Sequence, residues 1–461
     1  MIESLACKSD RNELLGAVNR ENCNLFLRKI EERTAIIGVI GLGYVGLPLI
    51  LSFNRRGFSV VGFDINKGLV DELMSGKSRI RHIPSDAIRQ MNDTGCFSAT
   101  TDYSGINKVD AILICVPTPL GRYREPDLSF IRATAEAMAP YLRRGQLVVL
   151  ESTTYPGTTR EILQPILEKG SGLKGNEDFI LAFSPEREDP GNAEFNTVTI
   201  PKVVGATTPE GEEMVAALYG SVIHKVVRVS SPETAEAVKL TENIFRAVNI
   251  ALVNELKLIY SAMGIDVWEV IDAAATKPFG FMPFYPGPGI GGHCIPIDPF
   301  YLTWKAREYG HHTRFIELAG EINKDMPQHV IGRLALELSR RQRKALNGAK
   351  VLIVGIAYKR NVDDMRESPA LMLMELLLAQ GAEINYHDPF IPEIPETREH
   401  AKLAKMQSVA WSAGVLASYD AAIIATNHDG LDWHLLVDNL PLIVDTRNAL
   451  ANFTSDRILK A

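Results

Sequence analysis

One short stretch in the second half of the chain combines a thiol, a carboxylate and residues that shape a turn. It reads Gly291-Gly292-His293-Cys294-Ile295-Pro296-Ile297-Asp298-Pro299. The glycines allow the backbone to approach a ligand closely, and the prolines stiffen the turn between the thiol and the carboxylate. Because thiolate reactivity depends on exposure and nearby charge, a cysteine on such a loop is a candidate nucleophile. The alternative is that Cys294 only fills space, as most unpaired cysteines do.

A glycine-rich turn near the start of the chain predicts a dinucleotide site. Gly41-Leu42-Gly43-Tyr44-Val45-Gly46 directly follows an apolar run, and the glycines permit a tight turn, close approach to a pyrophosphate and helix–strand packing. Asp64 lies 18 residues past Gly46, at the end of the next apolar run. A carboxylate there binds the adenosine ribose and repels a 2′-phosphate, which favours NAD over NADP. The alternative is a purely structural glycine turn.

Polar residues also follow three further apolar runs of this half. Thr118 and Thr153 come after two of them, and Glu186 comes after a third. Ligands bind at the carboxyl edge of open α/β sheets, so the two threonines are expected to line the nicotinamide side, with a carboxylate at the same edge. Ordinary capping by threonine and a solvated Glu–Arg pair are the competing interpretations.

Lys239 and Asn243 are four residues apart in a segment with helical periodicity, so they project from one face of the helix. Buried polar groups need partners, and this pair has the chemistry to donate hydrogen bonds to a developing oxyanion. The alternative is a solvated helix face that also holds Glu236 and Arg246. A thiol, an NAD fold and oxyanion donors together indicate oxidation of an aldehyde through a thioester, with water releasing the acid.

The strands and helices that must position these residues are predicted from apolar runs and from residues that break secondary structure. Short continuous apolar runs indicate strands covered on both faces of a parallel sheet; they span 36–40, 111–116, 147–150, 351–356 and 421–425. Val351–Gly355 echoes Ile37–Gly41, which predicts two related nucleotide-binding halves. The predicted fold is α/β, with two doubly wound, Rossmann-like domains joined by a long central helix and a helical dimerisation region.

The central helix is predicted over 232–263. Ser231 before Pro232 before Glu233 is an N-cap sequence, and Gly264 is a C′ glycine. The predicted divisions are a helical extension over 1–34, an NAD-binding domain over 35–228, a helical domain with the cysteine loop over 229–335 and a sugar-nucleotide domain over 336–461. Possible docking positions in the extension are Leu14, Leu15, Val18, Leu25, Phe26, Leu27 and Ile30.

Bulk properties exclude several classes of protein. The 461 residues carry a net charge of −7 with no basic run, which argues against a nucleic-acid partner. No apolar run approaches a membrane span of roughly 18 residues. The five cysteines are scattered and odd in number, so neither a disulfide framework nor a metal site is expected, and a cytoplasmic location fits.

These motifs together resemble the UDP-glucose/GDP-mannose dehydrogenase family over residues 35–455. The segments that carry the resemblance are Gly41–Gly46, Cys115–Pro119, Glu151–Thr159, Ser184–Arg187, Lys239–Asn243, Gly291–Pro299, Gly355–Lys359 and Arg366–Pro369. The family oxidises C6 of a nucleotide-linked hexose twice and consumes two NAD⁺ for each uronate. The resemblance implies a small-molecule nucleotide-sugar substrate, NAD as cofactor, a homodimer or higher homo-oligomer and no metal.

The resemblance also implies a role for each matching residue. Cys294 would form the thiohemiacetal and thioester, and Lys239 and Asn243 would stabilise the oxyanions. Asp298, with Thr153, would position the water. The implied catalytic set is Cys294, Lys239, Asn243, Asp298, Glu186 and Thr153. The implied cofactor contacts are Gly41, Gly43, Tyr44, Val45, Gly46, Asp64, Thr118, Thr153 and Arg366. The implied substrate contacts are Glu186, Arg187, Lys239, Asn243, Tyr285, Gly287, Gly291 and Lys359, the last at the UDP pyrophosphate.

Two departures bear on the substrate. The UDP-glucose branch typically has glutamate at the position of Pro190 and lysine at the position of Ile297. The segments 187–191 and 276–289 instead resemble enzymes that act on UDP-N-acetylhexosamines. The prediction is therefore oxidation of UDP-N-acetyl-D-glucosamine to its uronate for surface polysaccharide synthesis. UDP-N-acetylmannosamine or UDP-glucose as substrate, a non-catalytic nucleotide-sugar sensor, and a two-electron hydroxy-acid dehydrogenase are the alternatives.

Overall fold

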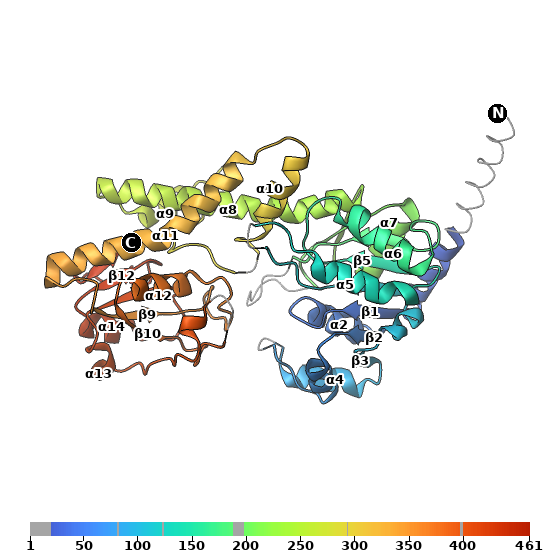
Figure 1. The fold of residues 1–461 in the computed structure, drawn as a ribbon, viewed down its shortest axis with the longest axis horizontal. Helices are drawn as coiled ribbons and strands as arrows, with labels where there is room; N and C mark the ends of the chain where they lie inside the picture. The colour runs from blue at the N-terminus through green and yellow to red at the C-terminus, as the bar shows by residue number, and fades with distance from the viewer. Residues whose placement is uncertain (1–19, 81–82, 122–123, 188–197, 293, 397–399) are drawn as a thin grey trace. The chain divides into compact units, whose positions relative to one another are not determined.

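The computed structural model describes residues 20–80, 83–121, 124–187, 198–292, 294–396 and 400–461. They form two compact units (Figure 1). The first unit comprises the residues up to 242 together with 304–310, and the second comprises 243–303 together with 311–461.

The first unit is built on an eight-stranded sheet with the order β3-β2-β1-β4-β5-β6-β7-β8. The strands are β1 (Ile36–Ile40), β2 (Ser59–Phe63), β3 (Phe97–Thr100), β4 (Ala111–Ile114), β5 (Leu147–Leu150), β6 (Ile180–Phe183), β7 (Lys202–Ala206) and β8 (Val226–Val229). Neighbouring strands are parallel except β6 and β7, which pair antiparallel. The expectation of a parallel sheet is therefore wrong at this one pairing. As antiparallel neighbours, β6 ends and β7 begins at the same edge of the sheet.

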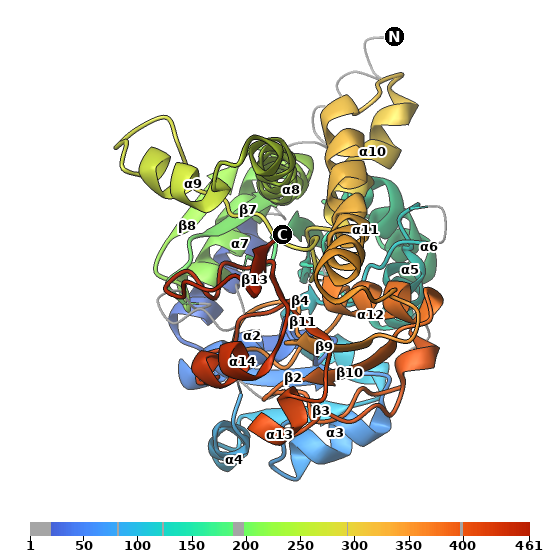
Figure 2. The same cartoon turned by 90° about the vertical axis from the view of Figure 1, so that its left-hand side faces the viewer.

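Helices cover both faces of this sheet (Figure 2). They are α2 (Gly46–Arg55), α3 (Lys67–Met74), α4 (Ser85–Asp93), α5 (Ser129–Met138), α6 (Gln164–Ser171) and α7 (Pro209–Gly220), with shorter turns η1 (Tyr103–Lys108), η2 (Ala139–Tyr141) and η3 (Thr159–Leu163). Leu47 and Ile50 of α2 and Leu218 of α7 join the strand side chains of one face in a single core. This two-sided cover explains why the strands read as continuous apolar runs.

A helical segment at residues 20–31 packs on the same core. Phe26 and Ile30 are buried and Leu27 is partly buried, as predicted. Leu25 is 52% exposed, so its predicted docking role is wrong, and the further buried position, one turn before Phe26, is Cys23. Leu14, Leu15 and Val18 lie outside the described residues.

The long helix α8 (Pro232–Met263) has the bounds that the sequence predicts. Ser231 Oγ accepts a hydrogen bond from the N–H of Thr234 at 3.2 Å, which is an N-cap, and Gly264 adopts φ = 73° just past the end. The helix contributes residues up to 242 to the first unit and the remainder to the second.

The second unit contains a five-stranded parallel sheet with the order β10-β9-β11-β12-β13. Its strands are β9 (Lys350–Val354), β10 (Glu383–His387), β11 (Ala421–Ile424), β12 (Ile443–Asp445) and β13 (Ile458–Lys460). Its helices are α9 (Val267–Ala275), α11 (Arg314–Gln342), α12 (Pro369–Ala379), α13 (Ala413–Leu416) and α14 (Trp433–Asn439), with the turn η4 (Ala401–Leu403). The helix α10 (Asp298–Glu308) begins in this unit, and its residues from 304 onward belong to the first. Helices α11 and α12 share one core with the sheet, and α13 and α14 share the other.

Both sheets are thus Rossmann-like, in agreement with the predicted fold class. None of the described helices is long and apolar enough to cross a membrane.

Candidate functional site

Each glycine of the turn after β1 has a different structural role. Gly41 adopts φ = 93°, and a Cβ on it would lie 2.5 Å from the carbonyl oxygen of Cys115. A Cβ on Gly46 would lie 1.9 Å from the carbonyl oxygen of Gly41. A Cβ on Gly43, in contrast, would meet nothing within 4 Å. The chain itself therefore requires Gly41 and Gly46, whereas the bare backbone at Gly43 faces open space, as an approaching pyrophosphate needs.

The predicted ribose carboxylate lies against this turn. Asp64 Oδ2 accepts a hydrogen bond from the N–H of Leu42 at 2.9 Å, and Oδ1 accepts one from Asn66 at 2.8 Å. The side chain stays partly exposed. Asp64 is therefore fixed in position while its carboxylate keeps lone pairs for further hydroxyl donors. Tyr44 is exposed on the same turn and Val45 is partly exposed.

The two threonines predicted at the carboxyl edge of the sheet do come together. Thr118 is buried, and its hydroxyl donates to the carbonyl of Thr153 at 2.7 Å. The hydroxyl of Ser152 donates to the carbonyl of Val116 at 2.7 Å. These bonds tie the segment after β4 to the segment after β5. Capping and ligand contact are therefore compatible here, because Thr153 remains partly exposed.

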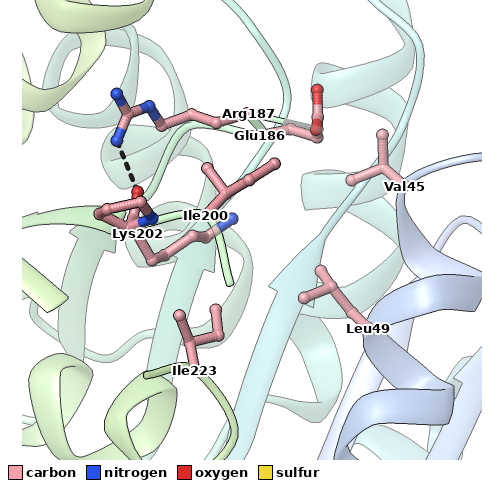
Figure 3. A pocket seen from close by; sticks show the side chains of 8 residues that line it. Val45, Leu49, Glu186, Arg187, Ile200, Lys202 and Ile223 are labelled. Carbon is pink, nitrogen blue, oxygen red and sulfur yellow. Dashed lines mark hydrogen bonds between the residues drawn. The ribbon is translucent and has the colours of Figure 1, made fainter. Parts of the chain in front are cut away.

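Glu186 and Arg187 follow β6 and point in opposite directions (Figure 3). Arg187 donates to the carbonyl of Pro201 at 2.5 Å and pairs with Glu242 of α8 at 2.6 Å. Arg187 thus connects the edge of the sheet to the central helix. Both residues line a pocket together with Val45, Leu49, Ile200, Pro201, Lys202 and Ile223.

Glu186 instead lies beside the predicted lysine of α8. Lys239 Nζ is 3.5 Å from Glu186 Oε2, and the lysine side chain is only 4% exposed. The first unit therefore holds a buried ammonium and a carboxylate at the edge where Thr118 and Thr153 lie. A solvated helix face does not describe this part of α8.

Asn243, one turn further along α8, is fully buried and joins two charged groups. Its Nδ2 donates to Asp298 Oδ2, and its Oδ1 accepts from Arg246. Asp298 is itself buried as the first residue of α10. Two of the predicted catalytic residues thus touch each other, and an amide with two N–H donors has one left for a further acceptor.

The cysteine loop is packed too tightly for side chains at its glycines. A Cβ on Gly291 would lie 2.8 Å from the carbonyl oxygen of Glu367, and Gly292 adopts φ = 88° against the ring of Tyr358. The N–H of Gly292 donates to the carbonyl of Arg366 at 3.2 Å. Cys294 follows, partly exposed, and its carbonyl accepts the N–H of Asp298 at 2.8 Å. The thiol residue therefore sits on a rigid turn that leads directly into α10.

Cys115 has a different environment. Burial, together with the negative charge of Glu151, raises the pKa of the Cys115 thiol well above its ordinary value. A thiol that stays protonated at neutral pH is a poor nucleophile. Cys115 therefore does not compete with Cys294 for a catalytic role.

The remaining predicted residues lie in the second unit. The hydroxyl of Tyr285 donates to Asp272 at 2.7 Å, and the N–H of Gly287 donates to Asn254 at 3.0 Å. Arg366 pairs with Asp364 at 2.6 Å. Lys359 is partly exposed on the segment between β9 and α12. His293 and residues 188–191 lie outside the described residues.

One buried residue of this region escaped sequence reasoning. Glu236 of α8, which was grouped with a solvated face, is fully buried and accepts hydrogen bonds from the N–H groups of Gly157 and Thr159 at 2.6 and 2.9 Å. Burial raises the pKa of Glu236 to about 7, although the bonds from Thr159 and Gly157 oppose this shift. Glu236 anchors the segment that follows Thr153 to the central helix. The signal available in the sequence was its spacing: Glu236, Lys239 and Asn243 fall on one helix face.

Each unit thus carries its own set of candidate functional groups. The first offers an anion-binding glycine turn, a ribose-type carboxylate and a carboxylate–ammonium pair. The second offers a thiol on a rigid turn, with a buried carboxylate–amide pair at the start of the following helix. Hydride acceptance by a dinucleotide and nucleophilic catalysis by a thiol are the two chemistries that these groups support.

Comparison with known proteins assigns both halves to one family. Three models of the UDP-glucose/GDP-mannose dehydrogenase family match the chain: the NAD binding domain at residues 35–223, the central domain at 233–325 and the UDP binding domain at 352–452.

Individual relatives agree over most of their length. The chain is 37% identical over 396 residues to a UDP-N-acetyl-D-glucosamine 6-dehydrogenase of Pseudomonas aeruginosa, covering 85% of this chain and 90% of that protein. It is 34% identical over 421 residues to a UDP-N-acetyl-D-mannosamine dehydrogenase of Pyrococcus horikoshii, covering 90% and 96%. The solved structure of a UDP-D-ManNAc dehydrogenase from Pyrococcus horikoshii superposes with a TM-score of 0.81 at 32% identity, covering 90% of this chain and 96% of that one.

Proposed function

The chain belongs to the UDP-glucose/GDP-mannose dehydrogenase family, and we propose that it oxidises the C6 hydroxyl of UDP-N-acetyl-D-glucosamine to the carboxylate in two NAD-dependent stages. The NAD binding and UDP binding domains of the family are both present. The finer proposal concerns the sugar and the roles of the site residues. The observation that carries the proposed roles is the buried Asn243–Asp298 contact, with Asp298 four residues after Cys294, whereas the proposed sugar rests on the likeness to the relative from Pseudomonas aeruginosa and on residues 276–289.

The residues of the first glycine turn fit the cofactor. The uncovered backbone at Gly43 would face the pyrophosphate, and Asp64, which Leu42 already orients, would bind the adenosine ribose. NAD⁺ bound there supplies the oxidising chemistry, since it accepts one hydride from C6 at each stage.

In the first stage, the chain's own groups move the hydroxyl proton and hold the developing charge. Glu186, beside Lys239, is proposed to take the proton of the C6 hydroxyl, directly or through water. Lys239 and the second N–H of the Asn243 amide are proposed to stabilise the oxygen as negative charge develops on it. The product of this stage is the C6 aldehyde.

In the second stage, Cys294 holds the substrate covalently. The thiolate adds to C6 of the aldehyde, a C–S bond forms, and the carbonyl oxygen takes the charge and then a proton. Loss of the C6 hydride and of the hydroxyl proton from this thiohemiacetal leaves a thioester, and Glu186 is proposed to take that proton as in the first stage. Asp298, with Thr153, is proposed to orient the water that attacks the thioester, so that the C–S bond breaks, the thiolate returns and the uronate leaves. Covalent attachment keeps the reactive aldehyde from escaping.

Substrate choice is proposed to lie in residues 276–289. This segment is anchored by Phe284, which packs in a small core with Val253 and Trp268, and by the bond from Tyr285 to Asp272. The large apolar side chains of Phe279, Phe281 and Met282 in the same segment are exposed. An N-acetyl group needs both space and a polar partner. This anchored segment is proposed to provide both. Relatives named for glucosamine and for mannosamine derivatives match the chain, which makes UDP-N-acetyl-D-mannosamine the alternative substrate.

The sugar is tested by following NADH with each of UDP-N-acetylglucosamine, UDP-N-acetylmannosamine and UDP-glucose. The proposal predicts the highest kcat/KM for the first. Equal or better turnover of UDP-glucose would remove the hexosamine assignment. A Cys294→Ser enzyme is expected to lose steady NADH production while still binding UDP, whereas a non-catalytic sensor would show no NADH production before the substitution either.

The proposal includes a homodimer or higher homo-oligomer in the cytoplasm. The second-unit part of α8 exposes Phe245, Leu252, Ile259 and Met263 on its surface. Their spacing of seven, seven and four residues makes one apolar stripe, which is costly to leave in water. Light scattering tests this: a monomer at micromolar concentration would contradict it.

A further inference from the structure

Two buried asparagines of the second unit lie against the segment that precedes the cysteine loop. Asn254 belongs to α8 and Asn323 to α11, and both side chains are buried. Nδ2 of Asn254 donates to Oδ1 of Asn323 at 2.9 Å. Burying two amides costs free energy unless their donors and acceptors are paired, so their other contacts show what the pair is for.

The two amides form one directed chain of hydrogen bonds. The N–H of Gly287 donates to Oδ1 of Asn254 at 3.0 Å, and Nδ2 of Asn323 donates to the carbonyl of Ala247 at 3.1 Å. A backbone N–H at one end and a backbone carbonyl at the other fix which atom of each amide is oxygen and which is nitrogen. Neither amide can flip without placing like groups against each other. The chain therefore ties Gly287 to both α8 and α11 in one arrangement.

The composition of the tied segment explains why it needs a side-chain partner. Pro286-Gly287-Pro288-Gly289 is buried, although it forms neither helix nor strand. Buried backbone N–H groups need acceptors, and the two prolines have no N–H to satisfy. Of the two N–H groups that remain, the one at Gly287 is satisfied by Asn254. Asn254 thus replaces the backbone acceptor that a helix or a neighbouring strand would supply.

The segment also packs directly on α11. Gly289 adopts φ = 135°, and a Cβ on it would lie 3.5 Å from the carbonyl oxygen of Asn323 and 3.5 Å from Cγ of Pro327. Pro327 is itself buried inside α11. The end of residues 276–289 is therefore held at two places, by the amide chain at Gly287 and by packing at Gly289.

We propose that Asn254 and Asn323 are positioning residues for substrate choice, which fix the end of residues 276–289 so that this segment keeps one position around the C2 substituent of the sugar. The inference rests on the proposed function, which assigns substrate choice to this segment. Neither asparagine needs to touch the substrate. Without the amide chain the segment can adopt several positions. It then distinguishes an N-acetyl group from a hydroxyl less well, because discrimination depends on contacts that one substrate makes and the other does not.

The kinetic test compares full-length variants with UDP-N-acetylglucosamine and UDP-glucose as substrates. Asn254→Leu removes the acceptor for Gly287, and we expect the ratio of the two kcat/KM values to fall at least about tenfold, chiefly through a higher KM for UDP-N-acetylglucosamine. Asn323→Leu keeps that acceptor and removes the group that orients it, so a fall of about threefold is expected. The KM for NAD⁺ should not change in either variant.

A matched control is available on another helix. The amide of Asn439 donates to the carbonyl of Leu435 within its own helix, α14, at 2.9 Å. Asn439→Leu makes the same chemical change away from residues 276–289, so the ratio of the two kcat/KM values should equal that of the wild type.

Hydrogen exchange tests the anchoring without any turnover. The amide of Gly287 should exchange at least about tenfold faster in Asn254→Leu than in the wild type, while strand β9 exchanges at the same rate in both. Since Pro286 and Pro288 have no amide hydrogen, a peptide over residues 285–289 reports chiefly on Gly287 and Gly289.

Two results would overturn the inference: an unchanged ratio of kcat/KM in Asn254→Leu, or unchanged exchange at Gly287. If Asn254→Leu does not fold, Asn323→Leu decides, and a ratio equal to that of the wild type would then count against the amide chain. If the wild type forms no NADH from any UDP-sugar, the proposed oxidation fails. The ratio is then measured as the calorimetric affinities for the two sugar nucleotides, so that the two failures remain distinguishable.

Discussion

The two Rossmann-like sheets share one arrangement of strand, glycine and carboxylate, but the environment of the carboxylate differs between them. In the first, Gly41 follows β1, packs against a carbonyl after β4, and precedes a backbone N–H that donates to Asp64 at the end of β2. In the second, Gly355 follows β9 with φ = 76°, and a Cβ on it would lie 2.1 Å from the carbonyl oxygen of Thr426 after β11. The N–H of Ile356 donates to Asp388, after β10, at 2.7 Å.

The two carboxylates differ in what remains of their hydrogen-bonding capacity. Asp64 is partly exposed and accepts two backbone N–H groups. Asp388 is buried and accepts four backbone N–H groups, from Ile356, Ala357, Phe390 and Ile391, and a further bond from His428 at 3.0 Å. Because Nδ1 of His428 accepts the N–H of Asn361, the proton that His428 donates lies on Nε2. Asp64 can still accept hydrogen bonds from ribose hydroxyls, whereas the acceptor capacity of Asp388 is already used.

The turns differ as well. After Gly41, the helix α2 starts at Gly46, so that its N-terminal N–H groups face the turn. After Gly355, the next helix, α12, starts only at Pro369. The intervening segment carries Lys359 and contacts the cysteine loop through Tyr358 and Arg366. The two sheets thus share the arrangement of strand, glycine and carboxylate, and they differ in the segment that follows the glycine.

The largest effect is expected at the glycines that both halves share. Gly355→Ala and Gly41→Ala each force a methyl group onto a carbonyl oxygen at positive φ, and we expect each to lose about 3 kcal/mol of unfolding free energy or more. Gly43→Ala is the matched control, because its methyl group meets nothing within 4 Å. Urea unfolding of Gly43→Ala should stay within about 0.5 kcal/mol of the wild type, while its NAD affinity falls. A large stability loss in Gly43→Ala would contradict the division of roles.

The next largest loss of unfolding free energy is expected when His428, which donates a hydrogen bond to Asp388, is replaced. His428→Leu leaves Asp388 and the N–H of Asn361 each without one buried bond, and we expect a loss of about 3 kcal/mol in unfolding free energy. NAD affinity, measured by fluorescence titration, should stay unchanged. A variant as stable as the wild type would mean that His428 does not support Asp388.

The buried carboxylates of the two halves should respond to pH in opposite directions. Burial holds the pKa of Glu236 at about 7, above its unfolded value, so its contribution is full below about pH 4.5 and is lost as pH rises through 7. We expect Glu236→Gln to remove about 2 kcal/mol of the stability decline between pH 5.5 and pH 8. Burial alone would raise the pKa of Asp388, yet bonds from His428 and the backbone hold it below its usual range, so its contribution is lost only on acidification. Parallel stability–pH curves for Glu236→Gln and the wild type would count against a raised pKa.

We expect the smallest change in unfolding free energy at Asp64, the partly exposed carboxylate. Asp64→Asn keeps an acceptor for the N–H of Leu42, so its melting temperature should change little. The loss of charge beside the ribose should weaken NAD binding about tenfold, or roughly 1.4 kcal/mol. UDP affinity is the control and should be unchanged. Weakened UDP binding would show that the two halves do not divide the ligands in this way.

Local sequence signals were enough to predict the helices and strands, but not the contacts between segments that are distant in the sequence. Ser231, Pro232 and Gly264 set the bounds of α8 because capping and helix termination are local. The apolar runs placed the strands because both faces of each sheet are covered. The antiparallel pairing of β7 and the exposure of Leu25 were missed, since direction and docking depend on contacts between distant segments.

The candidate site shows the same limit. The glycine turn and the Thr118–Thr153 meeting followed from their position at strand ends. The burial of Glu236 was missed because its partners, Gly157 and Thr159, lie more than seventy residues earlier in the chain. The catalytic roles and the division of the chain into four domains remain predictions.

We propose that one chain removes four electrons from C6, using a half that binds NAD and a half that binds UDP and carries the thiol. The most direct test is the amount of NADH formed per UDP-N-acetylglucosamine when the sugar nucleotide is limiting and NAD⁺ is in excess. We predict two NADH for each molecule consumed, with the uronate as product and no aldehyde in solution. One NADH per molecule, or none, would contradict the account.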